Sequence, residues 1–204
     1  MKLFYAPGTC SLAVHIVALE CNIELTMDRV NLKDAHRYTA SGQDYIRLNP
    51  KNNVPALELD DGVILTEGTA IIQFIADMTP KNSSIPIAGT IKRYYMQEWL
   101  SFISTEIHKM FSPWLFHPEY SQSALVVAHE KLHKAFEILE NTLVRNNYLM
   151  GDKFSVVDAY CFTIVRWSSS MGIDLSEYPN LQRYLKIIAV RPAVSKALSF
   201  DAMP

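Results

Sequence analysis

Apolar residues follow two different spacings along this chain, and the change falls near residue 80. In the first part, short apolar runs typical of strands alternate with helix-like segments. Residues 2–5 and 25–30 predict strands, and between them an apolar residue every three or four positions predicts a helix beginning at Ser11. A strand, a helix and a strand in succession indicate a small α/β unit with at least one parallel strand pair.

A hairpin and a second helix complete this part of the chain. Asp61 and Gly62 separate two apolar runs, residues 54–59 and 63–65, which indicates a hairpin closed by a two-residue turn. After Glu67, apolar residues recur at i, i+3, i+4 and i+7, as in an amphipathic helix.

Residues 79–89 hold two prolines and a glycine, so no helix is expected to run through them. We therefore divide the chain into residues 1–80, a linker at 81–89 and a second domain at 90–204. The second domain has only helical spacing, including an apolar residue every four positions at Ile91, Tyr95, Trp99, Ile103 and Ile107.

Four further helices follow from the same pattern. An apolar stripe runs from Leu125 to Leu143, and residues 156–165 are apolar on all sides, as in a fully buried helix. Ser155 followed by Asp158 predicts an N-terminal cap for that helix. Prolines at 179 and 192 punctuate the last two helices.

Composition narrows the class of protein. The chain has 19 basic and 21 acidic residues, a net charge of −2, which argues against nucleic acid as the main partner. No apolar run approaches the ~20 residues that a membrane span requires, and the turn at Pro7–Gly8 comes before any signal-peptide core. Three cysteines are too few for a disulfide framework, which favours a reducing cytoplasm.

Cys10 is the first candidate for chemistry, because it lies between a turn and a helix start. A helix N-terminus can lower a cysteine pKa from ~8.5 to between ~3.5 and ~7.5. Position 13 is alanine, so a local dithiol pair is absent and the thiol would form a mixed disulfide with a small thiol. The alternative is a buried residue that acts as a small apolar side chain.

Two backbone features are further candidates. Pro55 before a strand can follow a cis peptide bond and leave the main chain of Val54 open to an extended peptide, or it can be an ordinary edge-strand proline. Glu67 and Gly68 open a helix, where the carboxylate can either complement the helix dipole or receive a ligand's ammonium group.

A zinc-protease signature is also present. His129, Glu130 and His133 match His-Glu-x-x-His, and Glu177 is a conceivable third ligand. The two histidines flank the apolar stripe of their helix rather than facing a cleft, so we expect no metal there.

Six segments in order resemble the bacterial beta-class glutathione S-transferases, namely residues 1–12, 49–57, 65–68, 98–100, 106–109 and 151–160. The resemblance covers nearly the whole chain. It implies an α/β thioredoxin-like N-terminal domain, an all-α C-terminal helical domain and a homodimer. It also implies conjugation of glutathione to small electrophilic apolar substrates, with glutathione as co-substrate and no cofactor, and possible glutathione-dependent thiol-disulfide reductase activity through Cys10.

The same resemblance implies roles for individual residues. Cys10 meets the glutathione sulfur, Val54 pairs with its cysteinyl unit, and Glu67 with Gly68 holds its γ-glutamyl end. Arg37 lies near the glycyl carboxylate, with Lys33 as a competitor. His108 is a second catalytic group near the sulfur, and other glutathione contacts, partly from the neighbouring subunit, fall on Ser101, Thr105, Glu106 and Ile107.

Several assignments remain open from the sequence. Tyr5 and Ser11 are hydroxyl groups close to Cys10, but Tyr5 is expected in the core and Ser11 as a helix cap. A pocket for the second substrate is expected among Phe111, Trp114, Leu115 and Trp167. A non-catalytic binding or assembly protein on the same fold is the alternative function.

Overall fold

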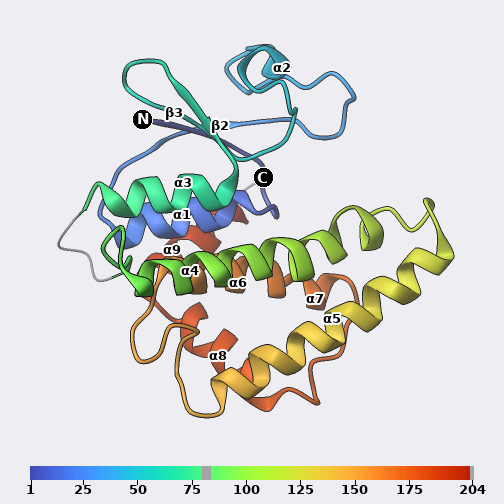
Figure 1. The fold of residues 1–204 in the computed structure, drawn as a ribbon. Coiled ribbons are helices and arrows are strands. Elements are labelled where there is room, and N and C mark those ends of the chain that lie inside the picture. Colours follow the sequence, from blue (N-terminus) through green and yellow to red (C-terminus); the bar gives the residue numbers. More distant parts are fainter. Residues whose placement is uncertain (80–83, 203–204) are drawn as a thin grey trace. The chain divides into compact units, whose positions relative to one another are not determined.

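The computed structural model describes residues 1–79 and 84–202, which form two compact units (Figure 1). The first unit contains residues 1–79 together with the last described segment, 191–202. The second unit contains residues 84–190. Part of the expected linker, residues 81–83, lies outside the described residues, and 84–89 contain turns and bends but no helix or strand.

The first unit is built on a four-stranded sheet in the order β2-β1-β3-β4. Strand β1 (Lys2–Tyr5) pairs in parallel with β2 (Thr26–Arg29) and antiparallel with β3 (Ala56–Glu58), which pairs antiparallel with β4 (Ile64–Thr66). Helices α1 (Ser11–Glu20) and α3 (Gly68–Asp77) pack side by side. The expected strand–helix–strand order, the parallel pair and the hairpin are therefore present.

The hairpin turn differs from the sequence prediction. The main-chain N–H of Leu59 donates to the carbonyl of Val63 at 2.8 Å, so three residues rather than two connect the strands. Gly62 has a φ of +84°, a left-handed conformation that closes a three-residue turn. The Asp61 carboxylate accepts the Val63 N–H at 3.1 Å and stabilises this turn.

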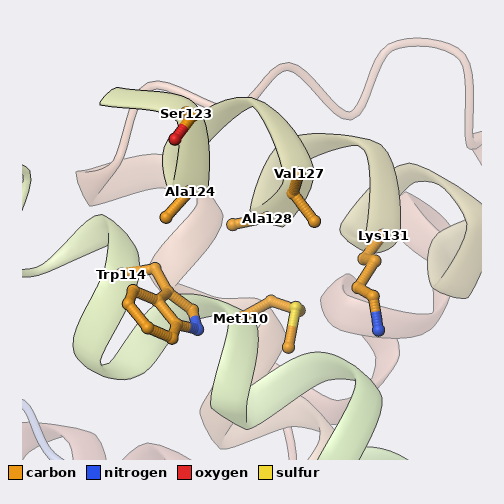
Figure 2. Close-up of a pocket in the computed structure, with 7 residues that line it drawn as sticks. All are labelled: Met110, Trp114, Ser123, Ala124, Val127, Ala128 and Lys131. Atoms are coloured by element: carbon orange, nitrogen blue, oxygen red, sulfur yellow. The ribbon is translucent and has the colours of Figure 1, made fainter. Parts of the chain in front are cut away.

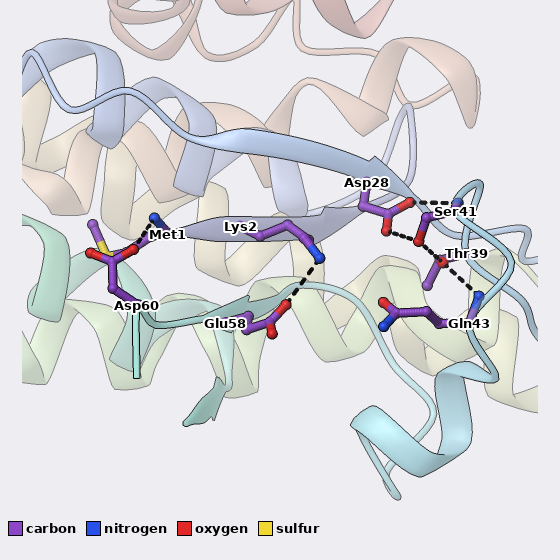
Figure 3. A network of polar contacts seen from close by, with 8 residues as sticks. All are labelled: Met1, Lys2, Asp28, Thr39, Ser41, Gln43, Glu58 and Asp60. Atoms are coloured by element: carbon purple, nitrogen blue, oxygen red, sulfur yellow. Dashed lines mark hydrogen bonds and ion pairs between the residues drawn. The ribbon is translucent and has the colours of Figure 1, made fainter. Parts of the chain in front are cut away.

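Polar contacts join the start of β1 to β3 and the turn after it, and others hold the loop that follows β2 (Figure 3). The buried carboxylate of Asp28 accepts the hydroxyl of Ser41 at 2.6 Å and its main-chain N–H at 3.2 Å. Thr39 shares a hydrogen bond with Ser41 and accepts the N–H of Gln43. This loop leads to the one-turn helix α2 (Tyr45–Leu48), which the spacing of apolar residues did not predict.

The last helix, α9 (Pro192–Asp201), belongs to the first unit rather than to the helical domain where the sequence division placed it. It packs on α1 (Figure 1), and the guanidinium of Arg191 forms a two-pronged ion pair with Glu20 at 2.7 and 2.8 Å. Phe200 lies against the rings of Tyr5 and His15. The domain boundary drawn from local composition therefore missed a contact between the two ends of the chain.

In the second unit, α4 (Ile91–Phe102) continues into a wider π-helical segment, η1 (Ile103–His108). The sequence predicted an apolar residue facing the core at every fourth position. This holds from η1 onward, where Ile103, Ile107 and Phe111 are buried, but not in α4, where Ile91 and Tyr95 are exposed. A π-helical turn contains more residues than an α-helical turn, which suits a spacing of four. The chain then forms η2 (Met110–Leu115), which is interrupted at Ser112 by an extended backbone.

The other helices of this unit follow the predicted pattern. In α5 (Gln122–Leu143) the predicted stripe is buried from Ala128 onward, and all ten residues of α6 (Val156–Val165) are buried. The short α7 (Trp167–Ser170) follows α6, and α8 (Pro179–Ala189) begins at its predicted proline. None of the helices within the described ranges is long and apolar enough to cross a membrane.

The predicted cap of α6 is confirmed. Asp158 is fully buried, and its carboxylate accepts the N–H and hydroxyl of Ser155, each at 2.8 Å. It also accepts the N–H of Leu149 at 2.9 Å and the hydroxyl of Tyr184 at 3.1 Å. Burial raises the pKa of Asp158 to about 6, although these four hydrogen bonds oppose the shift.

Candidate functional site

Cys10 lies at the N-terminal end of α1, half-buried, as the sequence predicted. Its thiol donates to the main-chain carbonyl of Val54 at 3.4 Å. The other two cysteines, Cys21 and Cys161, are buried, and burial raises the pKa of Cys161 well above its ordinary value. The partly exposed cysteine at a helix start is therefore the one suited to react with a small thiol.

The hydroxyl groups near Cys10 have structural roles. Thr9, rather than Ser11, caps α1, because its Oγ1 accepts the Ser11 N–H at 3.3 Å. Ser11 is buried, and its hydroxyl accepts a hydrogen bond from the hydroxyl of Thr9 at 2.9 Å. Tyr5 packs against Phe200, and partial burial raises its phenol pKa, so it is not poised to ionise.

The loop that precedes Cys10 is tied to α9. The N–H of Gly8 lies 3.2 and 3.1 Å from the two carboxylate oxygens of Asp201. Gly8 has a φ of +72°, which favours glycine. A residue almost two hundred positions away in sequence therefore helps to set the conformation of the turn that presents the thiol.

The main chain of Val54 is open on one side. The Val54–Pro55 peptide bond is cis, one of the two forms that the sequence allowed. Apart from the Cys10 thiol on its carbonyl, Val54 makes no main-chain hydrogen bond with any residue that the structure describes. An extended peptide could pair with both its N–H and its carbonyl.

Glu67 and the start of α3 form the next part of the site. Glu67 has a φ of +72°, a conformation rare for a residue with a side chain and often found at functional positions. Its carboxylate accepts the ammonium of Lys51 at 2.6 Å, and the same ammonium lies 3.0 Å from the hydroxyl of Thr66. The first main-chain N–H groups of α3, on Gly68 and Thr69, make no hydrogen bond within the described part of the chain.

Arg37 is better placed than Lys33 for a ligand carboxylate. Its guanidinium donates to the carbonyl of Asn52, two residues before Val54. Asn52 has a φ of +55°, a conformation that asparagine tolerates better than most residues. Lys33 lies in the exposed loop after β2, where its main-chain N–H donates to the side-chain oxygen of Asn31.

The predicted residues of the helical unit lie on one segment, from α4 into η1. Ser101 and Thr105 are exposed, one turn apart, and the Thr105 hydroxyl donates to the carbonyl of Ser101. Glu106 lies 3.8 Å from Lys131. Ile107 is wholly buried, so its side chain belongs to the core and only its main chain remains for a ligand.

His108 is half-buried and contacts aromatic side chains of its own unit. Its Nδ1 lies 2.7 Å from the phenol oxygen of Tyr160, and its ring lies 5.2 Å from that of Trp167. Trp167 also packs on Phe111 at 5.8 Å and on Phe116 at 5.1 Å. Because Phe111 is fully buried, its ring supports this cluster from within the core rather than lining an open pocket.

Trp114 points into a groove of about 370 Å³ between η2 and α5 (Figure 2). Met110, Val127 and Ala128 supply much of its apolar wall, and Lys131 lies at one end. The structure therefore groups Phe111 with Trp167 and places Trp114 in this groove. Leu115 is half-buried, and it is not among the residues that line the groove.

One residue of the zinc signature has a partner in the helical unit. Nδ1 of His133 lies 2.8 Å from the phenol oxygen of Tyr178. Among the residues that the structure describes, no group of three or more His, Cys, Asp or Glu side chains is arranged to hold a metal ion.

Three residues that these contacts single out were given no role from the sequence. Lys51 and Tyr160 each stood inside a segment that matches the family, but neither was given a role there. Asp201 carried no local signal, because it meets Gly8 across almost the whole length of the sequence.

Comparison with known proteins shows which family this chain is similar to. Residues 8–78 match the model of the glutathione S-transferase N-terminal domain, and residues 102–192 match that of its C-terminal domain. Glutathione S-transferase GstA of Escherichia coli O157:H7 is 38% identical over 203 residues, with both chains fully covered.

Solved structures give the same result. A ternary complex of BphK, described as a bacterial GST, has a TM-score of 0.96 at 42% identity, with full coverage of both chains. A beta-class glutathione S-transferase of Sphingomonas chungbukensis has a TM-score of 0.93 at 39% identity, also with full coverage of both. With both domain models matched and relatives aligned end to end, the chain belongs to the glutathione S-transferase family, in its bacterial beta class, and is a transferase.

Proposed function

We propose that this enzyme joins glutathione to small apolar electrophiles, with the tripeptide bound along Val54 and its sulfur beside Cys10. The observation that carries this proposal is the contact between the Cys10 thiol and the Val54 carbonyl. This contact places the half-buried Cys10 beside the main chain of Val54, which forms no other hydrogen bond within the described residues. A solved sphingomonad relative, 40% identical, is described as a complex with glutathione, which supports the choice of ligand.

Binding at Val54 would change the surroundings of the sulfur. As a donor to the carbonyl, the Cys10 thiol keeps its proton. The amide N–H of the glutathione cysteinyl unit is a stronger donor than a thiol and would replace it at that carbonyl. The tripeptide would thereby release the Cys10 sulfur from a contact that favours its neutral form.

The two ends of the tripeptide meet groups of opposite charge. Its γ-glutamyl ammonium would compete with Lys51 for the carboxylate of Glu67, and its α-carboxylate would accept the N–H of Gly68 at the start of α3. Its glycyl carboxylate would pair with Arg37, whose guanidinium donates to the carbonyl of Asn52, two residues before Val54. This arrangement selects for length and for the γ-linkage of the ligand.

In conjugation, the glutathione thiolate attacks the electrophile, a carbon–sulfur bond forms, and the leaving group departs with its electron pair. The enzyme contributes orientation of the sulfur and stabilisation of its charge. We assign Ser101, Thr105, Glu106, the main chain of Ile107 and His108 to further glutathione contacts, partly from the neighbouring subunit, on the strength of the family resemblance.

Disulfide reduction is a second candidate, favoured by the position of Cys10 at the start of α1. The Cys10 thiolate would attack the glutathione sulfur of a mixed disulfide and release the other thiol. A glutathione thiolate would then attack the enzyme-bound disulfide, yielding oxidised glutathione and free Cys10. A reaction of this kind belongs in a reducing cytoplasm, where we place the enzyme.

We also propose a homodimer. Helix α4 carries exposed apolar and aromatic side chains at Ile91, Tyr94 and Tyr95, more than a solvated helix face requires. Sedimentation at micromolar concentration should give twice the mass of the 204-residue chain. A monomer under those conditions would contradict the dimer.

Two assays test the function. The protein should be retained on immobilised glutathione and be eluted by free glutathione, and it should conjugate a model aryl halide. A parallel assay with a small glutathionylated disulfide ranks conjugation against reduction. Absence of turnover in both assays would remove the enzymatic proposal, and absence of retention would remove the binding site.

A further inference from the structure

The ammonium of Lys51 joins the loop before Val54 to the residues that precede α3. It lies 2.6 Å from a carboxylate oxygen of Glu67 and 3.0 Å from the hydroxyl of Thr66. An ammonium group has three protons to donate, and within the described residues these contacts use two of them. The Lys51 side chain is 52% exposed, so a ligand bound beside Glu67 can reach the third.

The main chain of Lys51 is held by a buried side chain. Asn49 is only 2% exposed, and its side-chain oxygen accepts the N–H of Lys51 at 3.1 Å. Its side-chain nitrogen donates to the carbonyl of Asn53 at 2.7 Å, so one residue spans the loop. The backbone of Lys51 is therefore fixed, and its flexible four-carbon stem can turn the ammonium from one acceptor to another.

Glu67 offers the opposite charge beside this ammonium. One of its carboxylate oxygens accepts from Lys51, and the side chain is 65% exposed, so a ligand has access to the group. Gly68, the next residue, adds a main-chain N–H that makes no hydrogen bond within the described ranges. A positive group, a negative group and an N–H donor are therefore grouped at the start of α3.

We propose that Lys51 is a specificity-determining residue, which makes the site select a γ-glutamyl end with an ammonium and a carboxylate on the same carbon. The proposal rests on the proposed function, because it takes glutathione to bind with its ammonium at Glu67. When that ammonium replaces Lys51 at Glu67, Lys51 keeps its contact with Thr66 and donates to the α-carboxylate of the ligand. One internal ion pair is thereby exchanged for two pairs between protein and ligand.

Ligands that carry only one of the two charges gain less from this exchange. A tripeptide without the α-carboxylate, γ-aminobutyryl-Cys-Gly, would take Glu67 from Lys51 and leave Lys51 without an anionic partner. A tripeptide without the α-amino group, glutaryl-Cys-Gly, would leave the internal pair intact and bind through Lys51 and the N–H of Gly68.

The variant Lys51→Met should therefore affect the two analogues in opposite directions. It removes the competitor of γ-aminobutyryl-Cys-Gly at Glu67, so this analogue should bind more tightly. It removes the cationic partner of glutaryl-Cys-Gly and leaves the charge of Glu67 uncompensated beside the ligand's carboxylate, so this analogue should bind more weakly.

Calorimetric titration at neutral pH measures Kd for glutathione and for both analogues on the unchanged enzyme and on Lys51→Met. Relative to the Kd of glutathione on the same protein, that of γ-aminobutyryl-Cys-Gly should fall about fivefold in the variant. That of glutaryl-Cys-Gly should rise about fivefold, as expected for the loss of one half-exposed ion pair. Both changes should shrink when salt is added, because salt screens exposed charges.

Lys2→Met is the matched control. The ammonium of Lys2 lies 3.2 Å from the carboxylate of Glu58 in the same unit (Figure 3). This variant removes the same charge from another lysine–glutamate pair, and it should leave the relative Kd values of both analogues as they are in the unchanged enzyme.

The outcomes separate this proposal from the proposed function. Relative Kd values that stay constant in Lys51→Met, or that both move in the same direction, would overturn the specificity role while glutathione still bound. Opposite shifts of equal size in Lys2→Met would also overturn it, because the change in net charge alone would then explain them. Failure of glutathione to bind the unchanged enzyme would instead overturn the proposed function, and the specificity role with it.

Discussion

The ammonium of Lys51 lies 2.6 Å from a carboxylate oxygen of Glu67, and the two residues are sixteen positions apart in the sequence. Both side chains are more than half exposed, so the pair adds little to folding stability. Its importance is that it occupies the carboxylate which the proposed function assigns to the ammonium of glutathione. The ligand must therefore replace an internal cation with its own.

Glu67→Gln should raise the KM for glutathione about tenfold or more, because a charge-assisted hydrogen bond contributes roughly 1.5–3 kcal/mol. The change should be measured with the electrophile held at saturation. A glutathione analogue without the amino group should bind the unchanged enzyme and the variant equally well. Glu58→Gln removes the same charge from an ion pair with Lys2 elsewhere in the sheet and should leave KM unchanged. An equal rise in both variants would contradict the assignment.

Oxidised glutathione should add one glutathionyl group to the protein, at Cys10. The other two thiols are buried and lack access to the reagent, and burial also raises the pKa of Cys161. Intact-mass analysis should show the adduct in Cys21→Ala and Cys161→Ala and its loss in Cys10→Ala. An adduct that persists in Cys10→Ala would place the reactive thiol elsewhere.

Asp201→Ala should slow the reaction of Cys10 severalfold. The carboxylate of Asp201 holds the N–H of Gly8, and its loss frees the turn that presents the thiol. The rate of thiol labelling by a small disulfide measures this effect directly. Ser199→Ala, which removes an exposed hydroxyl bonded only to its own helix, is the control. Equal labelling rates in the two variants would show that the turn keeps its shape without Asp201.

The buried carboxyl of Asp158 should make stability fall as pH rises. Its pKa is about 6 in the folded protein against an ordinary 3.8, so the folded state retains a proton that the unfolded state has lost. This difference contributes up to about 3 kcal/mol to the free energy of unfolding. The contribution is fully present below pH 3.8 and is lost as pH rises through 6.

Urea unfolding between pH 4 and 7.5 measures that contribution as the difference between the unchanged protein and Asp158→Asn. The difference should shrink with rising pH. Ser155→Ala removes the cap but keeps the carboxyl, so it should cost about 1–2 kcal/mol and preserve the pH dependence. A difference that grows with pH would mean that the four hydrogen bonds to Asp158 outweigh its burial.

Features that depend on neighbours in the sequence were predictable. The cap formed by Ser155 and Asp158 spans three residues, and the start of α8 follows from a proline, so local rules were sufficient. The turn before Val63 was misjudged by one residue, because a left-handed glycine suits both a two-residue and a three-residue connection.

Features that depend on distant contacts were not predictable from the pattern of residues. The pairs Lys51–Glu67 and His108–Tyr160 arise only when separate elements fold together. The roles of Cys10 and Val54 came from the family resemblance, and the structure adds that the two residues touch. Ile107 was placed at the ligand by the same resemblance, yet its side chain is buried, which local spacing alone could not reveal.

The inclusion of α9 in the N-terminal unit has a consequence for biosynthesis. A ribosome makes the sheet and α1 before α9, which carries the carboxylate that restrains Gly8. The nascent unit therefore remains incomplete while the helical unit is translated, and the thiol acquires its finished surroundings only once α9 has also been made.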